Sequence, residues 1–213
     1  MLYTQFEENE ILINSGLMGS LPSETLEAIK AQYNEPHRHY HAWHHALSVV
    51  SWVNYCASID PLAGYTHYEL ALAALFHDAV YDTEGSPSNE ERSVKFLRQH
   101  NHGCGMPATE HLIMLTAQHG KLSSRDVTPT EALFLDCDMS SFGERRWEIS
   151  LWNELNIHKE YLGKYTQEQV NMGRLHFLTG LYNKESIFLS QHFQDLFEAQ
   201  AHRNIKRLIA RLA

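Results

Sequence analysis

Four segments of the chain begin with the same short pattern, a Thr or Ser followed three residues later by Glu or Gln. In such a capping box the hydroxyl accepts a hydrogen bond from an orphan backbone N–H at the start of a helix, and the acid or amide reciprocates. The four pairs are Thr66–Glu69, Ser88–Glu91, Thr128–Glu131 and Thr166–Gln169. Strand signals are weak, since there is no sustained alternation of β-branched residues and no Asn-Gly or Asp-Gly hairpin. The pattern predicts an all-α protein.

Apolar periodicity completes a map of helices joined by short polar breaks. No internal repeat and no Pro/Gly/Ser-rich linker divides the 213 residues. We therefore expect one compact helical bundle over 1–213, with a core over about 22–182, a C-terminal segment over about 185–212 and a break near Ser190. The predicted helices are 22–33, 40–57, 66–79, 89–101, 107–118, 129–140, 144–161, 167–182 and 185–212.

Composition and charge exclude several classes of protein. Hydrophobic residues make up 43% of the chain, which excludes a disordered protein, and the net charge of −9 argues against generic binding to nucleic acid or anionic membranes. The longest apolar run, Leu70 to Phe76, is far shorter than the ~20 residues of a membrane span. Three cysteines without a paired spacing and an N-terminus without a signal-peptide pattern predict a cytoplasmic protein, and the amphipathic final segment is compatible with a homo-oligomer.

The chain contains 15 histidines, and five of them lie in the string HRHYHAWHH, from His37 to His45. Histidine is the commonest metal ligand in proteins. His41 and His45 are four residues apart on the helix predicted over 40–57, so we expect them to share one face of it. Because the rest of this helix is apolar, its histidine nitrogens need partners such as a metal ion.

Acidic residues at the ends of two apolar segments are candidate oxygen ligands for a metal ion. The run Leu70–Phe76 leads into His77-Asp78, and Asp82 follows four residues later. An imidazole beside a carboxylate suits a divalent transition metal better than calcium. In the segment LFLDCD, Asp136 and Asp138 point to different sides of a helix, both apolar, so periodicity does not choose between them.

A His, an adjacent His-Asp pair and a distant Asp resemble the HD superfamily of metal-dependent phosphohydrolases. The words LFHDAVYDTEGSPSNEERS and FLDCDMSSFG are similar to those of an uncharacterised bacterial family within it, and weaker similarity in KEYLGKY and AHRNI extends the resemblance over most of the chain. The resemblance implies an all-α HD-type fold and a divalent ion, one of Mn, Fe, Co, Ni, Zn or Mg. It implies Asp138 over Asp136 and the ligand set His45, His77, Asp78 and Asp138.

The same resemblance implies catalytic roles. YHAWHHA resembles a phrase of cyclic-nucleotide phosphodiesterases, which implies that His41 protonates the leaving oxygen. HDAVYDT resembles the HDxxEDT of guanosine-tetraphosphate hydrolases, which implies that Asp82 serves the attacking water, although Tyr81 replaces the Glu of that motif. The expected reaction is hydrolysis of a small phosphorylated substrate, nucleotide-like among others, by a metal-activated water.

Four further residues are candidates for contacts with the substrate: Arg38, His119, Asn89 and Glu90. Arg38, three residues before His41, is the first candidate for a phosphate clamp, ahead of Arg92, Lys121 and Arg174. Two alternatives stay open: an HD-fold diiron oxygenase, for which His119 is an additional ligand, and a non-catalytic module that binds a nucleotide or a metal.

Overall fold

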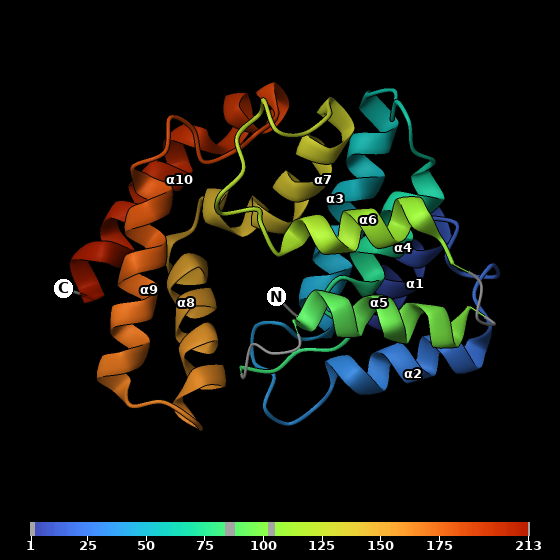
Figure 1. Ribbon diagram of the computed structural model, residues 1–213, viewed down its shortest axis with the longest axis horizontal. Helices are drawn as coiled ribbons and strands as arrows, with labels where there is room; N and C mark the ends of the chain where they lie inside the picture. Colours follow the sequence, from blue (N-terminus) through green and yellow to red (C-terminus); the bar gives the residue numbers. More distant parts are fainter. Residues whose placement is uncertain (1–2, 84–87, 102–104, 213) are drawn as a thin grey trace. The chain divides into compact units, whose positions relative to one another are not determined.

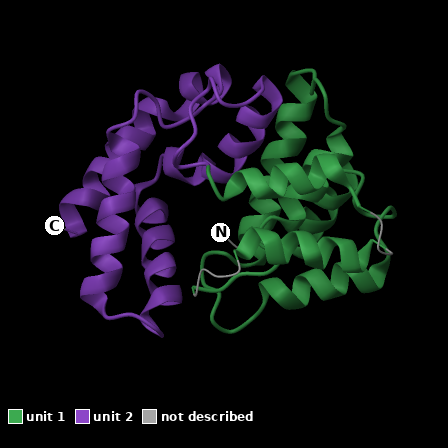
Figure 2. Cartoon of the chain, viewed as in Figure 1, with its two compact units in different colours: residues 1–118 green, residues 119–213 purple. Residues whose placement is uncertain are grey.

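The computed structural model describes residues 3–83, 88–101 and 105–212. These residues form ten α-helices and a single 3-10 helix, and no β-strand occurs among them, which confirms the all-α prediction (Figure 1). The chain divides into two compact units, Met1–Gln118 and His119–Ala213, each with its own core (Figure 2). Within the described ranges, no helix combines the length and the apolar character needed to cross a membrane.

The first unit is built around α4, the most apolar helix of the chain. Every residue from Leu70 to Phe76 is buried, and α4 packs against α3, α5 and α6, while α1 packs against α3. The helices of this unit are α1 (Gln5–Asn14), α2 (Ser23–Tyr33), α3 (Trp43–Ile59), α4 (His67–Phe76), α5 (Asn89–His100) and α6 (Pro107–Thr116). The apolar run thus places the residues that follow it, His77 and Asp78, at the end of seven buried helical residues.

The second unit is organised by its last helix, which packs against four other elements. Its core contains the buried aromatic side chains of Phe134, Phe188 and Phe193. The elements are α7 (Pro129–Met139), the 3-10 helix η1 (Ser140–Gly143), α8 (Trp147–Leu162), α9 (Gln167–Tyr182) and α10 (Gln191–Leu212). Helices α8 and α9 run side by side and contact each other (Figure 1).

All four predicted capping boxes are present, with both reciprocal hydrogen bonds formed. A fifth box, Thr4–Glu7, starts α1, which lies outside the predicted helices. Three boundaries differ from the prediction in ways that concern the site or the core. Helix α3 begins at Trp43 rather than near 40, α4 ends at Phe76 rather than 79, and α10 begins after Ser190, where the break was expected.

Candidate metal centre

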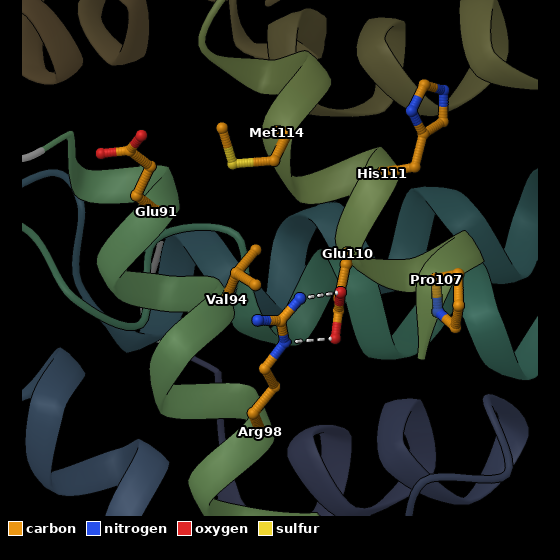
Figure 3. A pocket seen from close by; sticks show the side chains of 7 residues that line it. All are labelled: Glu91, Val94, Arg98, Pro107, Glu110, His111 and Met114. Carbon is orange, nitrogen blue, oxygen red and sulfur yellow. Dashed lines mark hydrogen bonds and ion pairs between the residues drawn. The ribbon is translucent and has the colours of Figure 1, made fainter. Parts of the chain in front are cut away.

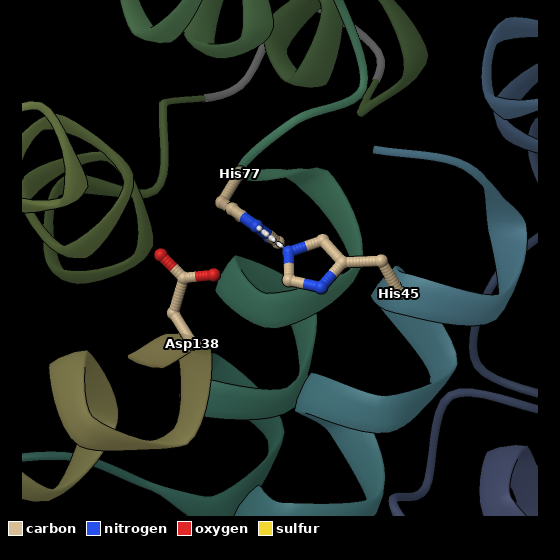
Figure 4. A group of neighbouring side chains, drawn as sticks. All are labelled: His45, His77 and Asp138. Carbon is tan, nitrogen blue, oxygen red and sulfur yellow. Dashed lines mark hydrogen bonds between the residues drawn. The ribbon is translucent and has the colours of Figure 1, made fainter. Parts of the chain in front are cut away.

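Three potential ligand atoms converge in the first unit. His45 lies in the first turn of α3, His77 is the C-cap of α4, and Asp78 follows it. The two Nε2 atoms lie 3.3 Å apart (Figure 4). Asp78 Oδ2 lies 3.1 Å from His77 Nε2 and 3.7 Å from His45 Nε2. Both imidazoles are almost fully buried, so their nitrogens depend on local partners rather than on bulk water.

The tautomer of His77 follows from its second ring nitrogen. His77 Nδ1 lies 2.8 Å from the backbone carbonyl of Ala74, one turn earlier in α4. A carbonyl oxygen only accepts, so Nδ1 carries the proton and, in the neutral ring, Nε2 presents a lone pair. Histidine ligands are commonly oriented in this way by a hydrogen bond from their other nitrogen.

The donor set fits a metal ion. His77 Nε2 faces a second imidazole nitrogen and a carboxylate oxygen, and a proton on His45 or a metal cation can satisfy this cluster of acceptors. Two imidazoles and a carboxylate are ligands typical of divalent transition metals. Within the first unit, the donors of His45 and His77 together with the carboxylate of Asp78 could hold such an ion.

The charge of Asp78 is set by competing effects. Burial alone would raise its pKa, but the adjacent His77, and then His41 and His45, hold the pKa of this carboxyl below its usual range. Asp78 is therefore an anion at neutral pH, as a metal ligand has to be.

Arg38, the predicted phosphate clamp, is engaged elsewhere. Its side chain is fully buried, with Nε 3.1 Å from Glu35 Oε2. Its Nη1 donates to the carbonyls of His41, at 3.2 Å, and Asp78, at 2.6 Å, and Nη2 donates to the carbonyl of Ala79, at 2.9 Å. The structure therefore does not support the clamp. Sequence spacing missed this arrangement because two of the partners, the carbonyls of Asp78 and Ala79, lie some 40 residues away.

His41 lies close to the ligand cluster, although the reason given by the sequence was wrong. Helix α3 starts at Trp43, so His41 precedes it and does not share a helical face with His45. Its ring nevertheless lies 5.8 Å from the ring of His45 and stacks on Tyr81 with centroids 4.1 Å apart. Tyr81 thus supports the ring of the predicted proton donor.

Asp82 belongs to a separate cluster with the start of α5. Its carboxylate forms an ion pair with Arg92, with Oδ2 2.6 Å from Nη1. Asn89 binds the backbone of Asp82 on both sides, accepting from its N–H at 3.1 Å and donating to its carbonyl at 2.9 Å, and it also contacts Arg92. Asn89 thus orients the backbone of Asp82. Arg92, which the sequence analysis ranked behind Arg38 as a phosphate clamp, is the ion-pair partner of Asp82.

Glu90, the next candidate, is partly buried near the start of α5. The neighbouring segment 84–87, part of the motif that predicted it, lies outside the described residues. The role of Glu90 therefore stays a prediction.

In the second unit the structure distinguishes Asp136 from Asp138. Asp136 is buried and accepts from the backbone N–H groups of Leu189 and Ser190, at 2.8 and 2.7 Å, and from the Ser190 hydroxyl at 2.6 Å. Burial raises the pKa of Asp136 to about 7, against the opposite effect of these donors. Its carboxylate fixes the chain that enters α10, so the geometry favours Asp138 as the ligand.

Asp138 is paired with the other histidine that the sequence singled out. His119 Nδ1 lies 3.1 Å from Asp138 Oδ2, and the carboxylate is only 10% exposed. Helix α6 ends at Thr116, so His119 lies in the turn beyond it, at the start of the second unit.

Arg174, another candidate for the phosphate clamp, is held by two hydrogen bonds of 2.8 Å to the buried Glu154.

A surface hollow of about 560 Å³ lies between α5 and α6 (Figure 3). Arg98 and Glu110 form a doubly hydrogen-bonded pair across it, at 2.8 and 2.6 Å. None of the predicted ligands lines this hollow, so it is not the candidate site. The residues around it are Glu91, Val94, Arg98, Pro107, Glu110, His111 and Met114.

Comparison with models of known protein families and with curated proteins finds no match. The functional argument therefore rests on the residues and their geometry.

Proposed function

We propose that this chain is a metal-dependent phosphohydrolase of the HD type that acts on a small phosphorylated substrate. His45, His77 and Asp78 would hold the divalent ion, with Asp138 as the fourth ligand that the sequence resemblance indicates. The observation that carries the proposal is the convergence of His45 Nε2, His77 Nε2 and Asp78 Oδ2 within 3.7 Å, with His77 Nδ1 committed to a backbone carbonyl.

The proposed chemistry follows from the ion and two side chains, His41 and Asp82. A divalent ion in this set would act as a Lewis acid toward water and toward a phosphoryl oxygen. His41, beside His45, would donate a proton to the leaving oxygen. Asp82, held by Arg92 and by the amide of Asn89, would orient the attacking water or accept its proton. A set of three or four protein ligands leaves positions for water and substrate.

The test is metal-dependent phosphate release by the full chain. The purified protein is loaded in turn with Mn, Fe, Co, Ni, Zn and Mg and assayed on generic phosphate esters and nucleotides, beside His77→Ala and Asp138→Asn. Replacement of the exposed His176 by Ala removes a histidine outside the cluster and serves as the control. We expect activity in wild type and in the control, and none in the two ligand variants. Bound metal without phosphate release from any substrate would contradict the hydrolase and favour a binding module.

One observation keeps the diiron oxygenase as the second candidate. His119 lies against Asp138, which adds an imidazole to the donors of the second unit, and oxygenases of this fold use more histidines. Iron content and oxygen consumption distinguish the two functions. Two irons per chain with oxygen uptake and no phosphate release would replace the hydrolase by the oxygenase.

We also propose a cytoplasmic location. The three cysteines, Cys56, Cys104 and Cys137, are widely spaced in the sequence and their odd number is unlike a disulfide framework. Fractionation of cells that express the full chain tests this location.

A further inference from the structure

The guanidinium of Arg38 joins two segments that carry proposed site residues. Nη1 donates to the carbonyl of His41 and also to the carbonyl of Asp78, and Nη2 donates to the carbonyl of Ala79. One planar group therefore fixes the backbone of the proposed proton donor and the backbone of the ligand turn that follows α4. A buried Arg with its donors satisfied in this way has little rotational freedom.

Aromatic contacts extend this arrangement to the ring of His41. The His41 ring stacks on Tyr81 at an interplanar angle of 23°. The Arg38 guanidinium carbon lies 5.7 Å from the centre of the Tyr81 ring and 5.1 Å from that of Tyr33, within the range of cation–π attraction. Arg38 thus contacts the ring of Tyr81, on which His41 stacks, as well as the backbone of His41.

We infer that Arg38 is a positioning residue, which holds His41 in register with the metal-ligand turn at His77 and Asp78. This inference rests on the proposed function for its catalytic half. The structural part of the inference, that Arg38 fixes the turn at His77 and Asp78, is tested by metal affinity alone. A Lys at this position keeps the charge but has a single donor nitrogen, so it cannot span the three carbonyls that the planar fork reaches.

The leaving group of the substrate separates a positioning role from a structural one. A phenolate such as p-nitrophenolate departs without a proton, whereas an alkoxide needs one, so loss of a proton donor slows alkyl ester hydrolysis selectively. The experiment compares p-nitrophenyl phosphate with an alkyl phosphate for wild type, His41→Gln, Arg38→Lys and the double variant. Arg98→Lys, a change of the same chemistry in an exposed pair of the same unit, is the control.

We expect Arg38→Lys to reproduce the selectivity of His41→Gln, with at least about a tenfold larger loss on the alkyl ester, because general acid catalysis contributes about 10²–10⁴-fold. At saturating metal, the double variant should lose little more activity on the alkyl ester than His41→Gln alone. Cobalt affinity should fall by about 10- to 100-fold in Arg38→Lys, as for other residues that orient ligands. Equal loss on both esters, or cobalt affinity equal to that of wild type, would overturn the inference.

Tyr81 provides a second test if Arg38→Lys folds poorly. Tyr81→Phe keeps the ring under His41 and should keep wild-type selectivity, while Tyr81→Leu removes the ring and should show the selective loss on the alkyl ester. Equal behaviour of the two Tyr81 variants would overturn the aromatic part of the arrangement. If wild type hydrolyses neither ester with any metal, the proposed function fails, and the cobalt measurement still decides whether Arg38 holds the ligand turn.

Discussion

His77 donates from Nδ1 to the carbonyl of Ala74 and turns Nε2 toward His45, whose Nε2 lies 3.3 Å away. Two imidazole nitrogens this close, with the Asp78 carboxylate beside them, need a proton or a metal cation between them. The relationship has a local origin in the sequence. The apolar run Leu70–Phe76 ends α4, and the next residue, His77, is buried with its ring bonded back to the last turn.

The two aspartates of α7 should separate stability from metal binding. Asp136 accepts three hydrogen bonds at the entry to α10, and Asn in its place can accept at only one oxygen, so buried N–H donors lose partners. We expect Asp136→Asn to cost about 2 kcal/mol, because an unsatisfied buried polar group costs about 1–3 kcal/mol. Asp138→Asn should leave the thermal midpoint of the metal-free protein nearly unchanged and should weaken metal binding. Calorimetry and metal titration of both variants check this contrast, and the reverse pattern would assign the ligand to Asp136.

Most of the helical framework could be predicted from the sequence, because capping boxes are local. Each hydroxyl and its partner lie three residues apart, and all four predicted boxes form. The overlooked box at Thr4 carries the same signature and was missed only because the apolar pattern after it is weak. The start of α3 was misplaced because the HRHYHAWHH string continues the helical spacing without a stop signal, while no capping side chain marks Trp43.

The candidate site was less predictable, because its key contacts join distant segments. The sequence indicated His45, His77 and Asp78, which the structure brings together. From the sequence alone, Arg38 was interpreted as a cation available to a phosphate, because its carbonyl partners at Asp78 and Ala79 are distant in the chain. In the same way, nothing near Asp82 in sequence marks Arg92 as its ion-pair partner. The choice between Asp136 and Asp138 needed the donors at Leu189 and Ser190, more than 50 residues away.

Gly143 should tolerate no side chain. A Cβ built on it would lie 2.6 Å from Cβ and from Cγ of Phe197, in the packing of η1 against α10. Since the Phe197 Cβ is fixed to its helix, Gly143→Ala should destabilise the second unit by about 1–3 kcal/mol, as overpacking does. Gly180→Ala is the opposite control. The Gly180 site in α9 has open space, and Ala should stabilise that helix by about 1 kcal/mol. Thermal unfolding should show a lower midpoint for Gly143→Ala and a higher one for Gly180→Ala. A midpoint of Gly143→Ala equal to that of wild type would refute the close approach of Gly143 to Phe197.

The pair Arg98–Glu110 predicts a pH dependence of stability. The hydrogen bond from Arg98 lowers the pKa of Glu110 below its ordinary value of 4.5, so the folded state favours the ionised carboxylate. The contribution is complete above about 4.5, where the unfolded chain is also ionised, and is lost as the pH falls through the lowered folded pKa. The difference in thermal midpoint between wild type and Glu110→Gln should therefore be present at neutral pH and shrink in acid.

The same titration on the exposed Glu10 provides the control for that prediction. Glu10 lies exposed on α1, and Glu10→Gln should leave the midpoint at neutral pH unchanged. A difference between wild type and Glu110→Gln that stayed constant from neutral to acid pH would contradict the role of the ion pair.

The start of α4 should contribute to stability without affecting the ligands at its other end. Thr66 forms both hydrogen bonds of the capping box with Glu69. Thr66→Ala should cost about 1 kcal/mol, the typical value of an N-cap, and leave metal affinity unchanged. Ser23→Ala, at a helix start without a side-chain cap, should be nearly neutral. Unfolding curves and metal titrations measure both, and a tenfold loss of metal affinity in Thr66→Ala would show that the cap also controls the site.

The most direct measurement is the metal content of the purified full chain, determined by mass spectrometry for wild type, His45→Ala, His77→Ala and His176→Ala. Because even residues that only orient a ligand affect affinity by about 10- to 100-fold, removal of a ligand should weaken binding by at least about 100-fold. The account predicts stoichiometric divalent metal in wild type and in His176→Ala, and none in the other two variants. Stoichiometric metal retained in both His45→Ala and His77→Ala would contradict it.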